Sequence, residues 1–413
     1  MINSPISQDS KTLIVQKYGG TSVGSPERIQ KVADRIAEAR AAGFQVVVAV
    51  SAMGHTTDEL IELAHKVSKN PPHREMDMLL SVGERISMAL LSMALADRKV
   101  PAISLTGSQA GIITDEGHRR ARIKRILGDR IRGALSENKV VIVAGFQGVS
   151  ESKEITTLGR GGSDTTAVAL AALLGASRCD IYTDVDGVYS ADPRLVPDAR
   201  LWSEIPAPFM VEMATRGAGV LHPRSVELAE QFGVPLYVKN SLNSNPGTRI
   251  VPIKFSDVLG GALKMEEFGI VGVTVDHSKL LITVQMARPT TIGALWDRAA
   301  QLHLPIVAPM FAEGVVRFFS DRDGEAEWKK VLGELSTDGF VHQYTVSEDM
   351  VPVSVIGHRF SQDGAALQEL IETLAQNHIS VTIGQSSALA ATLAVRQVHA
   401  DDAVKALHDR FVI

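Results

Sequence analysis

The sequence predicts an α/β domain, an αβα sandwich with a mostly parallel sheet, followed by two smaller α+β modules. From Leu13 to about Asn245, apolar strand-like runs alternate with helix-like stretches, which is typical of a parallel sheet covered by helices on both faces. Beyond about Pro252, the order strand, loop, helix, strand occurs twice. We therefore expect a flexible N-terminus over residues 1–11, the α/β domain over 12–250, and modules over 263–345 and 346–413.

The composition is that of an ordinary globular protein. Of 413 residues, 45% are hydrophobic and 22% are charged, and the net charge of −5 gives no footprint for nucleic acid or for an anionic membrane. No apolar run approaches the roughly 20 residues that span a bilayer, and the N-terminus lacks the regions of a signal peptide. The single cysteine, Cys179, excludes an internal disulfide. We expect a cytoplasmic protein without nucleic-acid or membrane partners.

The α/β domain begins with a strand over residues 12–17, which ends in a glycine turn over 18–24. Ser25 then caps a helix over 26–42 that has Pro26 in its first turn. Further expected elements are a strand over 44–50, a long apolar helix over 77–95, and strands over 140–144 and 180–183. In such sheets ligands bind beyond the carboxyl ends of the strands. The glycine turns at 19–24 and 159–162 and the turn at 183–187 are therefore expected to share one edge.

The two C-terminal modules are expected to be βαββαβ units in tandem. In the first module the expected elements are a strand over 279–286, a helix over 291–302 and a strand over 303–307. In the second they are a strand over 351–357, a helix over 364–376, a strand over 378–383, a strand over 392–398 and a helix over 402–411. One irregular α+β domain remains an alternative, since the two halves share little sequence.

The segment over residues 157–166 carries the most specific chemistry. Gly161 and Gly162 let the backbone come close to a ligand, and Ser163 or Asp164 can cap the helix that follows, whose free N–H groups attract anions. Arg160 adds a planar charged fork suited to a carboxylate. The segment therefore predicts a site for a small anionic substrate.

Three other segments have both a functional and an ordinary interpretation. Lys17 precedes a glycine turn and can neutralise phosphate oxygens, although a surface lysine beside a turn is equally common. The segment 51–58 offers small hydroxyl side chains to a polar substrate, or an N-cap to a helix over 59–66. The acidic turn 183–187 can orient Mg²⁺-nucleotide or bond adenosine hydroxyls, or form an Asx-turn.

Two further observations concern charged and metal-binding side chains. Glu84 lies in an otherwise apolar helix and is expected to be solvated or paired with Arg85, or to bind a substrate ammonium. His118, His222 and His378 have no cysteine or histidine at metal-ligand spacing, so we predict no metal site made by side chains alone.

Together these segments resemble the aspartate kinases of the amino-acid kinase family. The resemblance runs from about Leu13 to Asn245, and the C-terminal part is similar to the tandem ferredoxin-like ACT modules of that family. The matching segments, in order, are 17–23, 48–54, 75–87, 106–111, 145–148, 157–166 and 182–189.

The resemblance implies the reaction of ATP with L-aspartate to give ADP and 4-phospho-L-aspartate, with Mg²⁺, the first step towards lysine, threonine and methionine. It implies that Lys17 and Asp164 are catalytic, Lys17 contacting the phosphates and Asp164 organising it. The implied substrate-binding residues are Ser51, Thr57, Glu84 for the ammonium, Arg160 for a carboxylate, Gly161, Gly162 and Ser163. The implied ATP-binding residues are Lys17, Tyr18, Gly19, Gly20, Thr183, Asp184, Tyr189, Arg194, Gly219 and Val220.

Two departures from the family pattern matter. The family usually has a lysine where this chain has Gly219, so Lys239 or Arg216 replaces that contact or nucleotide binding is weaker. The usual effector-binding turn of the first module reads Ala287-Arg-Pro-Thr-Thr-Ile-Gly293, and the second module has Thr382-Ile-Gly-Gln-Ser-Ser387. We expect feedback by lysine or threonine to be weakened or altered. A homo-oligomer is expected from the paired ACT modules.

Two alternatives remain open from the sequence. One is a kinase acting on another acidic amino acid, such as glutamate or acetylglutamate. The other is a non-catalytic amino-acid-sensing regulatory subunit, for which Gly219 is the only support.

Overall fold

The computed structural model describes residues 12–253, 269–302, 304–358, 360 and 364–412, and these form two compact units. The first unit contains the described residues up to Val188, together with Leu201–Met210 and the described residues from Val220 to 253. The second contains Tyr189–Arg200, Val211–Gly219 and the remaining described residues. Two short segments of the range expected to form the α/β domain thus pack with the C-terminal part of the chain.

The first unit is built on an eight-stranded sheet in the order β10-β12-β11-β9-β1-β2-β6-β3. All neighbouring pairs from β11 to β3 are parallel, and only β12 runs antiparallel to its neighbour β11. This confirms the predicted mostly parallel sheet. The strands are β1 (Leu13–Tyr18), β2 (Gln45–Val50), β3 (Ala102–Leu105), β6 (Val140–Ala144), β9 (Arg178–Thr183), β10 (Glu204–Pro206), β11 (Leu236–Asn240) and β12 (Thr248–Val251).

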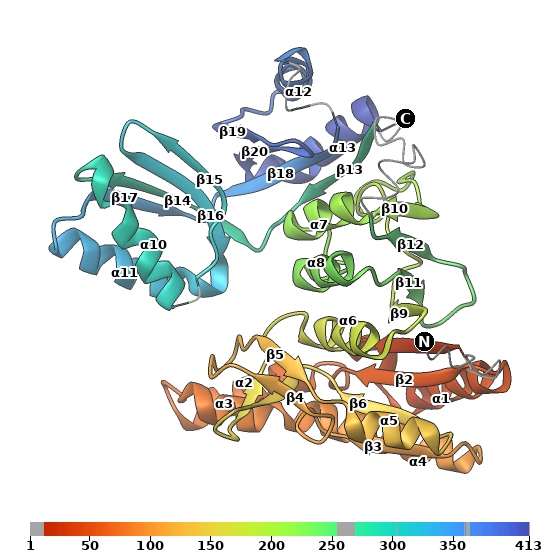
Figure 1. Ribbon diagram of the computed structural model, residues 1–413. Helices are drawn as coiled ribbons and strands as arrows, with labels where there is room; N and C mark the ends of the chain where they lie inside the picture. Colours follow the sequence, from red (N-terminus) through yellow and green to blue (C-terminus); the bar gives the residue numbers. More distant parts are fainter. Residues whose placement is uncertain (1–11, 254–268, 303, 359, 361–363, 413) are drawn as a thin grey trace, which may run out of the picture. The chain divides into compact units, whose positions relative to one another are not determined.

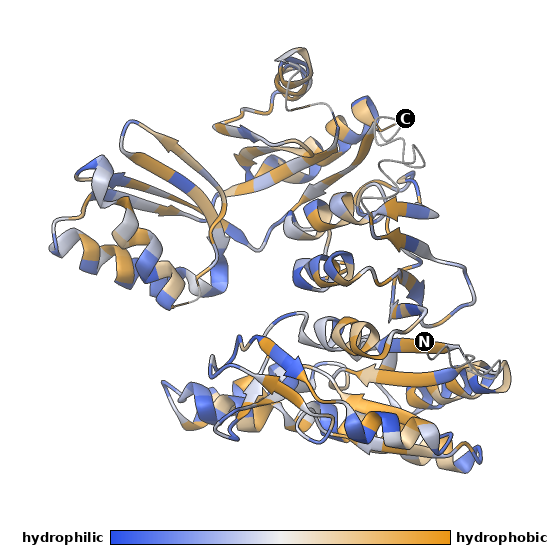
Figure 2. Cartoon of the chain, viewed as in Figure 1, coloured by the Kyte–Doolittle hydropathy of each residue, from blue (hydrophilic) through white to orange (hydrophobic). Residues whose placement is uncertain are grey.

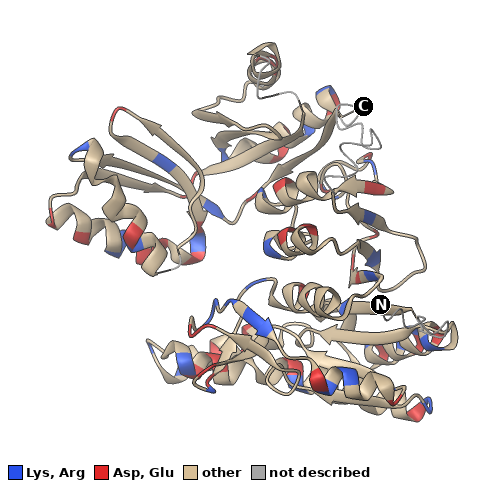
Figure 3. Cartoon of the chain, viewed as in Figure 1, with Lys and Arg blue, Asp and Glu red and all other residues tan. Residues whose placement is uncertain are grey.

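Helices cover both faces of this sheet (Figure 1). On one face α1 (Pro26–Ala41) and α4 (Val82–Asp97) enclose a core with Ile14, Tyr18 and Val48. On the other face α6 (Gly162–Leu174) packs on β1 and β2 and against α8 (Pro223–Phe232). Strands β2 and β6 are buried on both faces and are nearly continuous apolar runs. Strand β2 is mostly orange in Figure 2 and carries no charged residue in Figure 3.

A smaller four-stranded sheet in the order β5-β4-β7-β8 completes the first unit. Its strands are β4 (Ile112–Thr114), β5 (Ile123–Ile126), β7 (Gln147–Ser150) and β8 (Ile155–Thr157). The remaining helices here are α2 (Thr56–Val67), α3 (His73–Leu80), α5 (Asp129–Ser136) and the start of α7 (Ala207–Thr215). Strand β8 is important for the site, because it ends where the segment 157–166 begins.

The predicted long helix over 77–95 is two helices, α3 and α4, joined at Ser81. Residues His73–Asp97, 25 residues in all, contain an 18-residue window of mean hydropathy 1.5, so the segment is long and apolar enough to cross a membrane by length and composition. The expectation that no apolar run approaches this length is therefore wrong. Half of this window is buried inside the unit, and the 25-residue segment contains the buried acids Asp77 and Glu84. Both features are those of core helices in a folded domain.

The second unit contains two four-stranded sheets, in the orders β15-β16-β14-β17 and β13-β18-β20-β19. The first belongs to a contiguous βαββαβ module: β14 (Lys279–Met286), α10 (Ile292–Gln301), β15 (Val307–Ala312), β16 (Val315–Asp321), α11 (Glu325–Thr337) and β17 (Val341–Ser347). The second comprises β18 (Met350–Gly357), α12 (Gly364–Gln376), β19 (Ile383–Ser386), β20 (Ala390–Arg396) and α13 (Ala400–Phe411).

The fourth strand of the second sheet comes from the N-terminal side of the first module. Strand β13 (Ile270–Val275) lies in the range expected for the first module, yet it pairs antiparallel with β18. In the sequence, the first module thus lies between two strands that pair in the second module's sheet. The two modules therefore do not follow each other in simple tandem.

Two strands of these modules begin later than expected. The helix α10 continues into a closing turn, in which the Leu304 amide bonds the Ala299 carbonyl, so the strand expected over 303–307 starts at Val307; His303 lies outside the described residues. After α12 the chain turns at His378, whose φ is +60°, and the strand expected over 378–383 starts at Ile383.

Candidate active site

The carboxyl ends of four parallel strands meet at one edge of the large sheet. Tyr18 at the end of β1 is in register with Val50 of β2 and Tyr182 of β9, and Val50 with Ala144 of β6. Backbone hydrogen bonds continue past these ends, from Gly19 N to Tyr182 O, from Ser51 N to Tyr18 O and from Gly145 N to Val50 O. The loops that follow these strands therefore lie side by side, as the sequence predicts.

Lys17 and Asp164 form the central ion pair of this edge. The Lys17 Nζ lies 2.7 Å from Asp164 Oδ1, and both side chains are largely buried. Lys17 comes from the face of β1 that carries α6, while its neighbour Tyr18 faces α1. A Cβ added to Gly19 would lie 3.3 Å from Nζ, so the glycine leaves the ammonium next to bare backbone.

The start of α6 lies next to this ion pair. Gly161 is the N-cap residue, with φ +67°, and no side chain caps the helix. The expectation that Ser163 or Asp164 caps it is therefore wrong, because both residues already lie in the first helical turn and Asp164 is held by Lys17. An added Cβ at Gly161 would lie 2.1 Å from the Cβ of His222, so the position requires glycine.

The first turn of α6 packs closely on the neighbouring strand ends. A Cβ at Gly145 would lie 2.8 Å from Ser163 Oγ, and one at Gly162 would lie 2.9 Å from the ring of Phe146. Arg160, just before the cap, is exposed. The helix start thus offers backbone N–H groups and an arginine side chain at the edge where Lys17 ends.

Glu84 lies in the first turn of α4 and is 3% exposed. Its Oε1 accepts a hydrogen bond of 3.0 Å from the backbone N of Ala52, and its Oε2 has no hydrogen-bond partner among the described residues. Burial raises the pKa of Glu84 to about 7. The side chain is therefore not solvated, and in the described part of the chain no ion pair joins it to Arg85.

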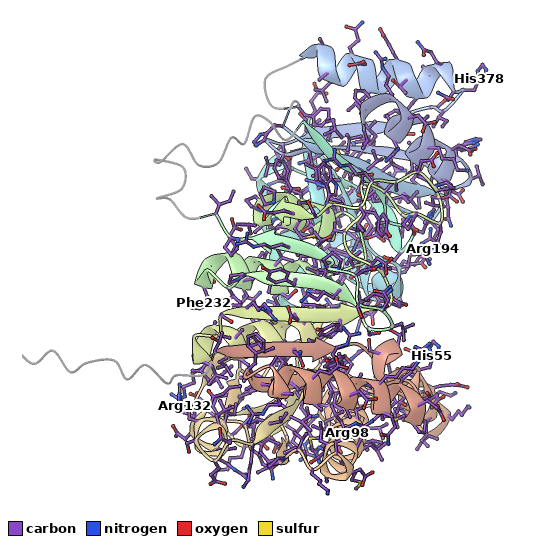
Figure 4. All side chains as sticks on the ribbon, turned by 90° about the vertical axis from the view of Figure 1, so that its right-hand side faces the viewer. His55, Arg98, Arg132, Arg194, Phe232 and His378 are labelled. Atoms are coloured by element: carbon purple, nitrogen blue, oxygen red, sulfur yellow. The ribbon has the colours of Figure 1, made fainter. Side chains whose placement is uncertain are left out.

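The loop after β2 brings Ser51 and Ala52 to the same region. Its backbone packs on the first glycine turn, with Gly54 N donating to Gly20 O over 3.0 Å. The following helix α2 begins at Thr56, earlier than the predicted 59, and its N-cap residue His55 makes no side-chain capping bond. His55 projects from the surface in Figure 4. Ser51 and Thr57 are half-buried and do not act as caps.

The acidic turn after β9 has a structural core. Asp186 accepts hydrogen bonds from the amides of Asn240, Asn243 and Asn245, which lowers its pKa. Its carboxylate therefore stabilises the loop, through side-chain amides of distant residues and not through the expected Asx-turn. Asp184 is exposed and accepts a hydrogen bond from the Thr183 hydroxyl over 3.1 Å, so these two remain placed to contact a ligand.

Five of the expected nucleotide-binding residues differ in burial or in the unit to which they belong. The Tyr18 ring is fully buried and stacks on Tyr182 at 4.8 Å, so only its backbone reaches the edge. Tyr189, Arg194 and Gly219 belong to the second unit, whereas Val220 belongs to the first. The Arg194 side chain, labelled in Figure 4, is exposed and bonds Asp192.

The two residues suggested as replacements for the family lysine at Gly219 already have partners. The Lys239 Nζ lies 3.1 Å from the buried carboxylate of Asp180. Arg216 bonds Glu212 at 2.7 Å and the Thr392 hydroxyl at 2.5 Å, both within the second unit. Gly219 itself has φ +67° and is exposed.

Two residues around the segment 157–166 were not predicted, the buried Asp77 and the half-buried Arg224. Asp77 accepts a hydrogen bond from Thr157, and Arg224 donates to the carbonyls of Ala121 and Leu158. The only signal in the sequence was an isolated acid within an apolar helix, which does not reveal its partners.

Comparison with known proteins identifies the family to which the chain belongs. The model of the amino acid kinase family matches residues 12–240. The aspartokinase of Mycolicibacterium smegmatis is 43% identical over 97% of this chain and 96% of that protein. The chain belongs to the amino acid kinase family, among the aspartokinases.

Other aspartokinases agree over the full length. That of Geobacillus stearothermophilus is 44% identical over 97% of both chains. The crystal structure of E. coli aspartokinase III in complex with aspartate and ADP has a TM-score of 0.83 at 24% identity, covering 96% of this chain and 99% of that one. At that identity the likeness shows the fold alone. The likeness covers the C-terminal modules of both chains as well as the α/β domain.

Proposed function

We propose that this chain transfers the γ-phosphoryl group of ATP to the side-chain carboxylate of L-aspartate, giving ADP and 4-phospho-L-aspartate. The observation that carries the proposal is the buried Lys17–Asp164 pair, at the strand edge where the Arg160 segment begins a helix. Full-length similarity to proteins named aspartokinase supports the same activity. The reaction is the first step towards lysine, threonine and methionine.

The chemistry needs few protein groups. The side chain of aspartate, with a pKa near 3.9, is already ionised at neutral pH, so its attack on phosphorus needs no general base. The transition state is loose and spreads charge over the phosphoryl oxygens, so positioning and cationic stabilisation suffice. Lys17 supplies the cation, and Asp164 fixes its ammonium in place. Mg²⁺ bound by the ATP phosphates would supply further neutralising charge.

The substrate is held by its charged groups. Arg160 would bind a carboxylate of aspartate as a planar fork, beside the N–H groups of Gly161, Gly162 and Ser163. Glu84, with Oε2 unpartnered among the described residues, would bind the α-ammonium. The hydroxyls of Ser51 and Thr57 would complete the site, and the small size of these residues suits a small amino acid.

The nucleotide would lie along the first glycine turn. Gly19 and Gly20 would face the phosphates, with Tyr18 contributing backbone only, and Thr183 and Asp184 would bond the nucleoside. The remaining residues proposed for this site are Tyr189, Arg194, Gly219 and Val220.

Release of ADP on addition of a candidate acceptor tests this function. With Mg²⁺-ATP, L-aspartate should give a much higher kcat/KM than L-glutamate or N-acetyl-L-glutamate. A preference for either of the other acids would favour a kinase for another acidic amino acid. A folded protein that binds lysine or threonine and turns over none of the three would favour a regulatory subunit.

Three further expectations remain proposals. We infer a homo-oligomer from the paired ACT-like modules, and a cytoplasmic location for a biosynthetic enzyme that uses ATP. We also infer that lysine or threonine, if either binds the ACT-like modules, inhibits weakly or in an altered pattern.

A further inference from the structure

A buried carboxylate outside the residues assigned to substrates holds the base of the Arg160 segment. Asp77 of α3 is 0% exposed. It accepts hydrogen bonds from the Thr157 hydroxyl at 2.6 Å and from the backbone N of Arg119 at 3.1 Å, and its Oδ2 lies 2.7 Å from His118 Nδ1. The carboxylate thus ties β8 and the 115–121 loop to α3.

This arrangement suits a charged group far from water. An ionised carboxylate is costly to bury unless hydrogen bonds satisfy its oxygens. Thr157 and Arg119 approach Oδ1, while Arg119 and His118 approach Oδ2. With a carboxylate as its neighbour, the His118 Nδ1 carries the proton. The three donors thus come from β8 and from the 115–121 loop, and the Asp77 carboxylate holds both segments against α3.

The contacts lead directly to Arg160. Thr157 ends β8, three residues before Arg160. Leu158 donates to Phe146 O at 2.8 Å, and its carbonyl accepts from Arg224 at 3.3 Å. Gly159, with φ +77°, packs so closely on the 119–120 backbone that an added Cβ would lie 2.9 Å from Arg119 O. The exposed Arg160 is therefore positioned by backbone that Asp77 anchors on two sides.

The same pair of helices carries Glu84. Helix α3 ends at Leu80 and α4 begins at Val82, and the carbonyl of Ser81 between them accepts a hydrogen bond of 2.8 Å from Gln147 Nε2. The α3–α4 pair thus carries Glu84 itself and holds the Arg160 segment through the bond between Asp77 and Thr157.

We propose that Asp77 is a positioning residue that fixes the distance between Arg160 and Glu84, and thereby the affinity for the amino-acid substrate. It does not touch the substrate, because its side chain is fully enclosed. The proposal rests on the function proposed above, in which these two side chains bind opposite charges of aspartate.

Steady-state kinetics of Asp77→Asn test the proposal. The asparagine has the same shape, but its NH₂ group meets one of the donors that the carboxylate accepts, so the anchor loosens. We expect KM for aspartate to rise about tenfold or more, since small displacements of binding groups are costly. KM for ATP should stay within about twofold.

Two sets of variants separate positioning from general stability. Thr157→Val removes the hydroxyl and should raise KM for aspartate, while Thr157→Ser keeps it and should resemble the wild type. Asp180→Asn is the matched control, because it also removes a buried carboxylate, one that pairs with Arg178 and Lys239. It should lower the melting temperature without a selective rise in KM for aspartate.

A folded Asp77→Asn enzyme with wild-type KM for aspartate would overturn the proposal. An equal rise of both KM values, as a merely structural role predicts, would also overturn it. If Asp77→Asn does not fold, the comparison of Thr157→Val with Thr157→Ser tests the proposal instead. Equal KM values for aspartate in these two variants would contradict it. A failure of the proposed function is distinguishable, since the wild type would then release no ADP with aspartate.

Discussion

The carboxylate of Glu84 is buried between the loop after β2 and its own helix, where Ala52 N binds one of its oxygens. Its raised pKa, about 7, results from burial without a compensating charge. A substrate ammonium would supply that charge. The side chain is thus poised to lose its proton when aspartate binds.

The pH dependence of catalysis should show this carboxyl group. Below pH 7 the free enzyme holds Glu84 largely protonated, so kcat/KM for aspartate should fall as the pH decreases through about 7. Glu84→Gln should raise KM for aspartate and flatten this limb of the profile. A Glu84→Gln enzyme that retains the wild-type limb would show that another group titrates there.

Lys17 should act mainly on the chemical step. Lys17→Met removes the cation next to the proposed phosphate position, so kcat should fall by about a hundredfold or more, as for other electrostatic groups in active sites. Lys17→Arg keeps the charge and the pairing with Asp164, and it should retain more activity. Rapid-quench kinetics would measure the step, and an unchanged rate in Lys17→Met would contradict the assignment.

Single residues differ in how far the sequence predicts their surroundings. The contact between Lys17 and Asp164 was expected from the family resemblance, which implies that Asp164 organises Lys17. Glu84 was expected to be solvated or paired with Arg85, or to bind a substrate ammonium, and its burial excludes the solvated interpretation. Burial depends on which helix face meets the core, and the binding of an ammonium stays a prediction. The contacts of Asp77 and Asp186 needed the structure, because their partners lie 41 to 80 residues and 54 to 59 residues away in sequence, respectively.

At the scale of elements, α6 has a left-handed glycine at each end, Gly161 before its first turn and Gly175 after its last. The two positions differ in their surroundings. An added Cβ at Gly161 would collide with His222, while at Gly175 it would meet nothing within 4 Å. The helix therefore offers a matched pair of substitutions.

Gly161→Ala should reduce aspartate kinase activity strongly, because the start of α6 must shift away from His222. Gly175→Ala should cost about 1 kcal/mol of stability through its left-handed backbone and leave activity intact. Thermal unfolding and ADP release measured on both variants check this. Equal activity in the two would mean that the position of the α6 start is not critical.

The order of the elements was predictable, but their ends were less so. The alternation of strands and helices, and the carboxyl edge they form, follow from apolar runs and glycine turns. The break between α3 and α4 at Ser81 interrupts an apolar pattern that reads as one helix, because Ser81 O bonds Gln147 from a distant strand. The late starts of β15 and β19 reflect helix-closing turns that local propensity does not reveal.

At the scale of the whole chain, the pairing of β13 with β18 joins residues about 80 positions apart and encloses the first ACT-like module. Such long-range pairing cannot be derived from periodicity, because any of the strands has the pattern to take that place. The sequence did predict that the C-terminal part is α+β with a repeated order of elements.

At the scale of the whole chain, the sequence also predicts weakened feedback inhibition by lysine and threonine. The segments Ala287–Gly293 and Thr382–Ser387 lack the residues usual at effector sites of the family, and a ligand regulates only if its affinity differs between two states. Millimolar lysine and threonine, alone or together, should therefore inhibit less than about twofold. Strong concerted inhibition in the ADP-release assay would contradict this expectation.

The central claim is that the site transfers phosphate to the side-chain carboxylate of aspartate, and an isotope label tests it most directly. The enzyme is incubated with Mg²⁺-ATP and L-aspartate carrying ¹⁸O only in the side-chain carboxylate, and hydroxylamine traps the acyl phosphate. Hydroxylamine attacks the carbonyl carbon, so the released phosphate keeps the oxygen through which it was attached. We predict aspartate hydroxamate together with phosphate containing one ¹⁸O, and unlabelled phosphate or no turnover would contradict the account.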